Sequence, residues 1–183
     1  MEIKETPIKG VFEIYPQVFE DERGFFLEVF REDLLRQHGI HDDWVQENQS
    51  FSHKGTVRGL HYQQSPYAQA KLARVIVGRA WDVCVDLRRN SPTFGMHHAV
   101  ILDSSKHNML FMPEGFAHGF SALEDTVFIY KCSNKYNKAS EGGIAWDDAQ
   151  LNIQWGVDMP LISEKDLALP TLNKFVQDSE GGL

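Results

Sequence analysis

The sequence predicts an all-β protein in which the strands form an antiparallel jelly-roll barrel with a few short helices. Its apolar runs are short and rich in β-branched and aromatic residues, and turn residues separate them at close intervals. No helical segment lies between successive runs, so the crossovers that parallel strands need are missing. At 183 residues the chain fits a single domain that spans residues 1–183.

One helix is expected early in the chain, between Arg31 and Gly39. Glu32 and Asp33 would lie in its first turn, where negative charge is favoured, and the glycine would end it. The polar, glycine-rich end of the chain, from about residue 174 to 183, is expected to be frayed. The expected strands cover residues 57–63, 71–77, 80–87, 98–102, 108–112 and 126–131.

Composition excludes several classes of partner. The net charge of -8 argues against a general binder of nucleic acid or of membrane surfaces, because such proteins need clustered Lys and Arg. Glu2 and Lys4 interrupt any signal-peptide core, and no apolar run approaches the ~20 residues that span a bilayer. Cys84 and Cys132 lack CxxC spacing. These features predict a cytoplasmic protein without a membrane partner.

Two segments with histidine are the most informative part of the sequence. The second, Pro113–Gly119, resembles the back half of a cupin signature, in which a Pro-x-Gly turn delivers a histidine into a small barrel. The first, Arg58–Tyr62, offers one histidine where a metal-binding cupin would usually offer His-x-His. We therefore expect His61 and His118 to act in a barrel that holds no metal ion.

A simple hairpin would bring His61 and Lys71 together. If residues 64–70 closed a hairpin centred near Pro66, these two residues would be cross-strand partners with Cβ atoms about 5 Å apart. The adjacent ammonium would then disfavour a protonated imidazole and leave a neutral base near neutral pH. His61 could take a proton next to a carbonyl while Lys71 stabilised the developing enolate oxygen.

Each of these residues also has a plainer interpretation. His61 could be a barrel-wall histidine and Lys71 a rim charge, and a tyrosine such as Tyr130 is common in strands. Ser163 and Asp166 have the spacing of a helix capping box, which would make the carboxylate a structural cap.

Many ordered segments of the chain resemble the dTDP-4-dehydrorhamnose 3,5-epimerase family of nucleotide-sugar enzymes. The likeness runs from about Met1 to Asn173, so it covers nearly the whole sequence. The matching segments are Phe19–Glu28, Gln46–Ser50, Val57–Gln63, Gln69–Leu72, Asp86–Arg88, Ser91–Gly95, Pro113–Phe120, Tyr130–Lys131, Tyr136, Glu141–Ile144, Trp146–Asp148 and Leu161–Asp166.

The resemblance implies a set of catalytic roles. His61 is implied as the base that removes protons at C3 and C5 of a 4-keto sugar, and Asp166 as the carboxylate that orients its ring. Lys71 is implied as the stabiliser of the enolate. Tyr130 is implied as the acid that returns a proton to the opposite face, and Tyr136 remains an alternative acid.

The resemblance also implies how the substrate is bound. Arg58 and His118 should contact the sugar or the diphosphate, and Asp82 should support the polar network around Lys71. Either Phe19 or Phe26 could stack on the thymine ring.

A second copy of the chain is also implied. In the family, the segment that holds Phe19, Arg23 and Glu28 approaches the active site from a neighbouring subunit, together with Gln46 and Asn48. We therefore expect a homodimer with exchanged N-terminal strands, in which residues from about 1 to 55 contribute to the dimer and to the nucleotide site.

The predicted activity is cofactor-independent epimerisation of dTDP-4-keto-6-deoxyglucose at C3 and C5, giving dTDP-4-dehydro-L-rhamnose. Three alternatives stay open at the level of sequence. Relatives that act at only C3 or only C5 carry nearly the same residues. A metal-dependent cupin would need more ligands than the Tyr and Gln residues that follow His61 provide. A noncatalytic sugar-nucleotide module would leave the base, the oxyanion partner and the acid unexplained.

Overall fold

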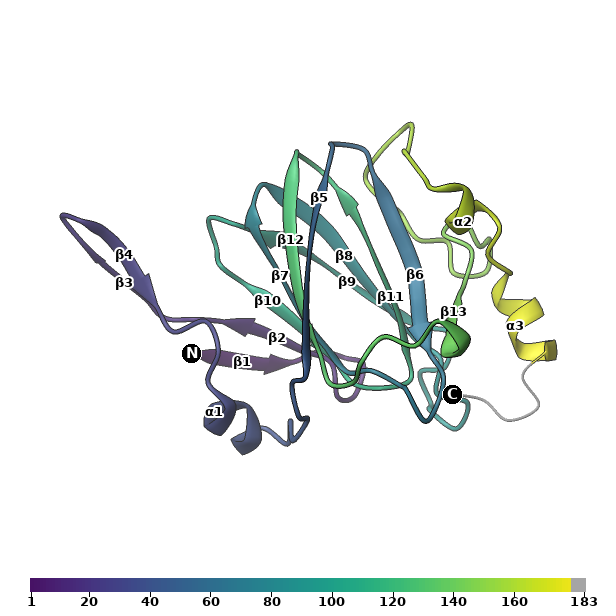
Figure 1. The fold of residues 1–183 in the computed structure, drawn as a ribbon, viewed down its shortest axis with the longest axis horizontal. Coiled ribbons are helices and arrows are strands. Elements are labelled where there is room, and N and C mark those ends of the chain that lie inside the picture. Colours follow the sequence, from purple (N-terminus) through teal and green to yellow (C-terminus); the bar gives the residue numbers. More distant parts are fainter. Residues whose placement is uncertain (179–183) are drawn as a thin grey trace.

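The fold is an antiparallel jelly roll built from two main sheets, as Figure 1 shows for the computed structural model, which describes residues 1–178. The six-stranded sheet has the order β1 (Glu2–Glu5), β2 (Phe12–Tyr15), β10 (Met109–Met112), β7 (Lys71–Val77), β12 (Thr126–Cys132), β5 (Gln46–Ser52). The five-stranded sheet has the order β13 (Glu141–Gly143), β6 (Val57–Gln63), β11 (Phe116–Ala122), β8 (Arg79–Asp86), β9 (His97–Asp103). This architecture confirms the predicted all-β jelly roll.

The core between the two sheets is apolar and aromatic. Ala73, Val75 and Phe128 from the six-stranded sheet meet Cys84 and Phe120 from the five-stranded sheet in one buried cluster. The rings of Phe120 and Phe128 stack face to face with centroids 4.1 Å apart. Burial of such side chains stabilises the packing of one sheet against the other.

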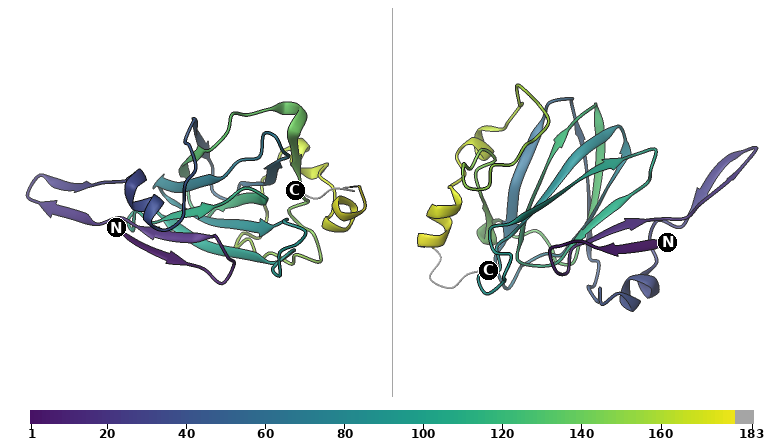
Figure 2. Two further views of the ribbon diagram at one scale, coloured as in Figure 1. Left: turned by 90° about the horizontal axis from the view of Figure 1, so that it is seen from below. Right: turned by 180° about the vertical axis from the view of Figure 1, so that it is seen from behind.

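The C-terminal segment covers the outer face of the five-stranded sheet. The helices α2 (Glu164–Leu167) and α3 (Leu172–Asp178) lie beside β6 and β13 in Figure 2, and Leu172 and Phe175 pack into the cluster that contains Leu60. Residues 174–178 are therefore helical, against the expectation of a frayed tail, because this face of α3 is buried. The remainder of the expected tail lies outside the residues described.

Strands 57–63 and 71–77 have the predicted bounds, and α1 (Glu32–Gln37) lies within the predicted helix. The strands before residue 57 were not predicted as such. Two of them, β3 (Val18–Asp21) and β4 (Gly24–Leu27), form a separate hairpin that projects from the barrel (Figures 1 and 2). Phe19, Phe25 and Phe26 on this hairpin are 51%, 59% and 66% exposed.

Two glycines let β6 and β11 approach unusually closely. A Cβ atom on Gly59 would lie 2.5 Å from the Cα atom of Gly119, and a Cβ atom on Gly119 would lie 2.6 Å from the carbonyl oxygen of Arg58. The pairing of the strands shifts here, between His118 and Phe120. This irregularity explains why both histidine-bearing segments carry a glycine beside their functional residues.

Both cysteines, Cys84 and Cys132, are buried and free. Across residues 1–178 we find no helix with the length and apolar character needed to cross a membrane.

Candidate active site

A polar pocket opens between the two sheets at one end of the barrel. Its lining comes from β5, β6, β7, β11, β12 and β13 together with the start of α2. The predicted site residues that line it are Gln46, Asn48, Arg58, His61, Lys71, His118, Tyr130, Tyr136 and Asp166. The structure thus gathers residues that are more than a hundred positions apart in the sequence.

The strand irregularity at Gly59 places two functional side chains in this pocket. Arg58 and His61 are three residues apart, so a regular strand would direct them to opposite faces of the sheet. Both nevertheless line the pocket, because the β6–β11 ladder shifts register between them.

His61 and Asp166 form a hydrogen-bonded pair. The Nε2 atom of His61 lies 2.7 Å from Oδ1 of Asp166, and Oδ2 of Asp166 accepts from the backbone N–H of Gly59 at 3.3 Å. Burial raises the pKa of Asp166, but the bond to His61, the Gly59 amide and the charge of Lys165 outweigh it, so the net pKa is lowered. An ionised Asp166 accepts the Nε2–H of His61 and leaves Nδ1 of the ring as the free basic nitrogen.

Only half of the capping-box interpretation holds, because Ser163 caps the helix while the carboxylate of Asp166 bonds His61 and Gly59. The side chain of Ser163 caps α2 by accepting from the backbone N–H of Asp166 at 3.2 Å. The cap uses the main chain of Asp166 and leaves its carboxylate for His61. Helix α2 therefore positions Asp166, and the carboxylate of Asp166 in turn fixes the imidazole of His61.

The predicted hairpin between His61 and Lys71 is wrong. His61 pairs with His118 on β11 and with Gly143 on β13, whereas Lys71 pairs with Met112 on β10 and Cys132 on β12. The connection from 64 to 70 carries the chain from one sheet to the other instead of turning back on β6. The two residues still lie close together, because both line the pocket and Nζ of Lys71 donates to the backbone carbonyl oxygen of His61 at 3.2 Å.

Lys71 is a buried cation. Its burial lowers the pKa of the ammonium group, and this effect exceeds the opposing influence of Cys132, Asp82 and Glu141, which raise it. In its protonated form, a buried lysine side chain is well suited to stabilise an oxyanion, since electrostatic attraction is stronger away from bulk water.

The two candidate acids have different surroundings. Tyr130 lines the pocket beside His118, and its pKa is raised by burial and by Cys132 and Glu141, against the opposing effects of Asn48 and Arg58. Its phenol therefore holds its proton at neutral pH.

Tyr136 is 54% exposed at the pocket mouth, and its hydroxyl donates to Oε2 of Glu141 at 2.9 Å. Because the proton of Tyr136 is engaged by a carboxylate, the geometry favours Tyr130 as the acid.

The remaining predicted residues of the barrel lie in or next to the pocket. Arg58 is fixed by its Nε donating to Oγ of Ser52 at 3.0 Å and its Nη2 donating to the carbonyl of Phe51 at 3.2 Å. Gln46 donates from Nε2 to Oδ1 of Asn48 at 3.0 Å, and both residues line the pocket of their own chain, although they were expected to approach it from a neighbouring subunit. Asp82 does not line the pocket but lies behind it, bonded to His118.

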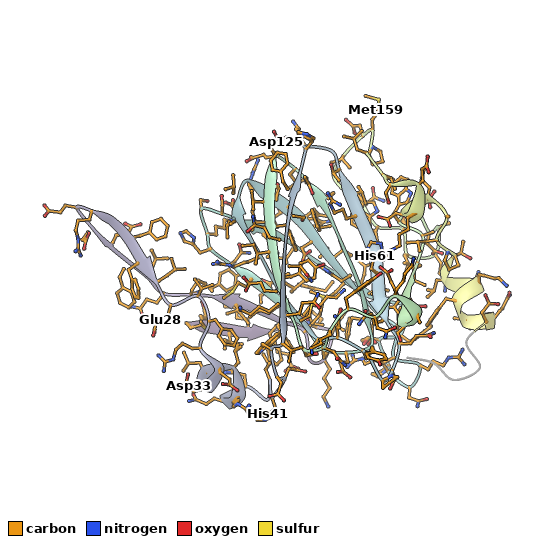
Figure 3. All side chains as sticks on the ribbon, in the orientation of Figure 1. Glu28, Asp33, His41, His61, Asp125 and Met159 are labelled. Carbon is orange, nitrogen blue, oxygen red and sulfur yellow. The ribbon has the colours of Figure 1, made fainter. Side chains whose placement is uncertain are left out.

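Four predicted substrate contacts lie away from the pocket in this chain. Phe19, Arg23 and Phe26 are on the projecting hairpin, and Figure 3 shows Glu28 at its base, far from His61. Arg23 is bonded to Asp21, and Glu28 to Arg31. A single copy of the chain does not bring these residues to the site.

Sequence reasoning missed two residues at the pocket mouth. Nζ of Lys165 donates to Oε1 of Glu141 at 2.7 Å, and both line the pocket. Glu141 and Lys165 both lie in segments that resemble the family. The two residues are 24 positions apart, and no local sequence pattern predicts that they form an ion pair.

No group of three or more His, Cys, Asp or Glu side chains within residues 1–178 is arranged to hold a metal ion. The pocket instead presents imidazole, ammonium, guanidinium and phenol groups, which transfer or stabilise protons and anions directly.

The sequence matches those of one family of known enzymes. The sequence model of the family described as dTDP-4-dehydrorhamnose 3,5-epimerase matches residues 5–174. A dTDP-4-dehydrorhamnose 3,5-epimerase of Shigella flexneri is 48% identical over 169 residues, which are 91% of this chain and 93% of that protein.

Two solved structures are similar over nearly their whole length. The Legionella pneumophila dTDP-6-deoxy-D-glucose-3,5-epimerase in complex with dTDP-4-keto-L-rhamnose has a TM-score of 0.90 and 43% identity, covering 94% of this chain and 93% of that one. A 3'-monoepimerase of Streptomyces bikiniensis in complex with dTDP-quinovose has a TM-score of 0.88 and 34% identity, covering 94% and 88%. This chain belongs to the dTDP-4-dehydrorhamnose 3,5-epimerase family and is an isomerase that acts on sugars.

Proposed function

We propose that this protein epimerises dTDP-4-keto-6-deoxyglucose at C3 and C5, with His61 as the base, Lys71 as the stabiliser of the enolate and Tyr130 as the acid. The observation that carries the proposal is the His61–Asp166 pair, which lines the same pocket as the buried Lys71 side chain and the phenol of Tyr130. Family membership supplies the substrate class.

The first half of the reaction is a proton transfer from carbon. The C4 ketone makes the hydrogens on C3 and C5 acidic, because the electron pair left on carbon moves onto the C4 oxygen as an enolate. Nδ1 of His61 accepts the proton, and the hydrogen bond from Nε2 to Asp166 stabilises the imidazolium that forms. The ammonium of Lys71 stabilises the negative C4 oxygen.

The second half requires a proton from the other face of the ring. If His61 alone returned the proton, it would restore the original configuration, so inversion needs a separate donor. Tyr130 lies on β12 in the six-stranded sheet, whereas His61 lies on β6 in the five-stranded sheet. A sugar held between the sheets would therefore have the base on one side and the acid on the other.

Incubation of the protein with dTDP-4-keto-6-deoxyglucose in deuterated water tests the proposal, with NMR of the sugar at C3 and C5. Deuterium at both carbons is the expected result. Deuterium at one carbon would assign the chain to the single-site activity seen in the Streptomyces relative. Absence of deuterium would contradict the proposed chemistry for this substrate.

We also propose that the active unit is a homodimer in which the β3–β4 hairpin of one chain completes the pocket of its partner. Two observations support this assembly. The hairpin projects from the barrel with Phe19 and Phe26 largely exposed, and the pocket in one chain lacks the predicted nucleotide contacts Arg23 and Glu28. Light scattering of the purified protein should give twice the mass of one chain.

We propose that the reaction needs no cofactor and takes place in the cytoplasm. Every step above is a proton transfer, for which the side chains in the pocket suffice. The free thiols of Cys84 and Cys132 fit a reducing compartment. Activity should survive exhaustive dialysis against a chelator, and loss of activity that added zinc or iron restores would contradict this part of the proposal.

A further inference from the structure

A second pair of histidine and aspartate lies directly beside the first. His118 is the register partner of His61 on the neighbouring strand, so both imidazoles are directed to the same side of the sheet. Nε2 of His118 lies 2.7 Å from Oδ1 of Asp82 on β8, and both side chains are buried. The ring of His118 also contacts the rings of Phe128 and Tyr130, with centroids 6.0 Å and 6.3 Å away.

Asp82 is unusual among the buried polar groups. Its side chain is 0% exposed, and Oδ2 has no hydrogen-bond partner within the part of the chain that the structure describes. An unpaired oxygen on a buried carboxylate is costly, so a purely structural role would favour an apolar or neutral residue at this position.

Another carboxylate on the same strand shows how a structural aspartate is accommodated. Asp86 is also 0% exposed, and its oxygens accept hydrogen bonds from Arg88, Ser91 and Thr93. Asp86 has the complete set of partners that Asp82 lacks. Both residues have even numbers on β8 and so face the same side of the sheet.

Asp82 also influences the pKa of Lys71. No direct ion pair joins them, yet the charge of Asp82 opposes the lowering of the Lys71 pKa that burial causes. The other groups that act on Lys71 are Cys132 on β12 and Glu141 on β13. Asp82 thus faces His118 with one oxygen and contributes a negative charge to the surroundings of Lys71.

We propose that Asp82 is a positioning residue: it holds the imidazole of His118 so that Nδ1 is left for the sugar, and it does not touch the substrate itself. Because the carboxylate accepts the Nε2–H of His118, only Nδ1 is left for a sugar oxygen. The inference rests on the proposed function in one respect, namely that this pocket binds the keto sugar.

The test compares Asp82→Asn with Asp86→Asn, a matched change of a buried carboxylate on the same strand. The asparagine side chain keeps the size of the aspartate but removes its charge. Asp82→Asn should raise KM roughly tenfold, because a neutral acceptor holds His118 less firmly than a charged one, and should move the alkaline limb of the kcat/KM profile to lower pH. Asp86→Asn should lower stability and leave KM and the alkaline limb unchanged.

A double-mutant cycle shows whether Asp82 acts through His118. In a His118→Asn background, Asp82→Asn should raise KM much less than it does alone, while the shift of the alkaline limb should persist. An unchanged KM and alkaline limb in Asp82→Asn, or equal shifts in Asp86→Asn, would overturn the proposal.

A further test uses the unmodified protein without substrate, so it does not require Asp82→Asn to fold. It also does not depend on turnover. Nitrogen-15 NMR should show His118 protonated at Nε2. A neutral ring protonated only at Nδ1 would overturn the inference even if the epimerase activity were confirmed. If turnover failed and the Nε2–H signal were found, the proposed function would be at fault and not the role of Asp82.

Discussion

The barrel pocket and the projecting hairpin differ in how far one copy of the chain completes them. In the pocket, His61, Lys71 and Asp166 are held by hydrogen bonds within the chain, although they come from strands and a helix far apart in sequence. On the hairpin, Phe26 is 66% exposed and the Arg23 side chain is hydrogen-bonded to the nearby Asp21. One chain therefore places the residues proposed for proton transfer, whereas it does not bring the residues expected to recognise the nucleotide to its own pocket.

This difference separates two kinds of functional constraint. Proton transfer needs groups fixed within a fraction of an ångström, which a packed barrel provides. Nucleotide binding tolerates a mobile element that becomes ordered against a second surface. Changes to the barrel residues proposed for proton transfer should therefore reduce kcat, and changes on the hairpin should raise KM.

The largest effect is expected for the acid. Tyr130→Phe removes the proton donor and should lower kcat about 10³-fold while KM changes little. Tyr136→Phe is the control, because its hydroxyl is already bonded to Glu141, and it should lower kcat far less. Steady-state kinetics on both variants would contradict the assignment of the acid if Tyr136→Phe had the larger effect on kcat.

The next effect tests the hairpin. Arg23→Glu should raise KM about 10²-fold with little change in kcat, because a charge-assisted contact to the diphosphate becomes a repulsion. If the site is shared, co-expression of inactive His61→Ala with Arg23→Glu should give dimers in which one pocket carries both changes and the other neither.

The co-expressed preparation should show about a quarter of the normal activity at low substrate concentration, since half of all dimers are mixed and one of the two sites in each mixed dimer is intact. Co-expression of His61→Ala with Lys71→Ala is the control and should restore nothing, because both residues belong to the pocket of their own chain. Equal activity in the two mixtures would show that the hairpin does not serve its partner.

A smaller effect is expected from pH. Burial lowers the pKa of Lys71, so the ammonium is lost as pH rises through a value below the ordinary one of about 10.4. Because the neutral amine cannot stabilise the enolate, kcat/KM should fall on the alkaline side below that pH. The pKa of Tyr130 is raised instead, so loss of its proton comes at higher pH. An alkaline limb at or above the ordinary lysine value would contradict the role of Lys71.

The smallest effect concerns the scaffold. Gly119→Ala would place a Cβ atom 2.6 Å from the carbonyl of Arg58, so it should lower the free energy of unfolding by about 1–3 kcal/mol and disturb the pocket. A Cβ atom on Gly24 in the hairpin meets no atom within 4 Å, although its φ of +126° disfavours a side chain. Urea denaturation should show a larger loss for Gly119→Ala than for Gly24→Ala, and the reverse order would contradict the close approach of β6 and β11.

Local patterns in the sequence predicted β6 to β10 and β12, but not β11, β13 or the strands before residue 57, and not which strands pair. Alternation and turn residues located 57–63 and 71–77, because burial of one strand face is a local signal. Pairing of β6 with β7 was wrong, since a connection of this length can close a hairpin or cross between sheets. The Lys71 side chain nevertheless reaches the His61 carbonyl, so the two residues were correctly associated through an incorrect geometry.

The contacts that complete the site join residues that are far apart in sequence, so local sequence patterns do not predict them. The bond from His61 to Asp166 spans 105 positions, and only family likeness brought the two together in the sequence analysis. The bond from His118 to Asp82 joins different strands of one sheet, and the unpaired oxygen of Asp82 became visible only in three dimensions.

The most direct test of the account is solvent exchange in a His61→Ala variant. The variant should bind dTDP as the unmodified protein does and incorporate no deuterium at C3 or C5 of the keto sugar in deuterated water. Incorporation at the rate of the unmodified protein would show that another group removes these protons, and it would contradict the role of the His61 imidazole.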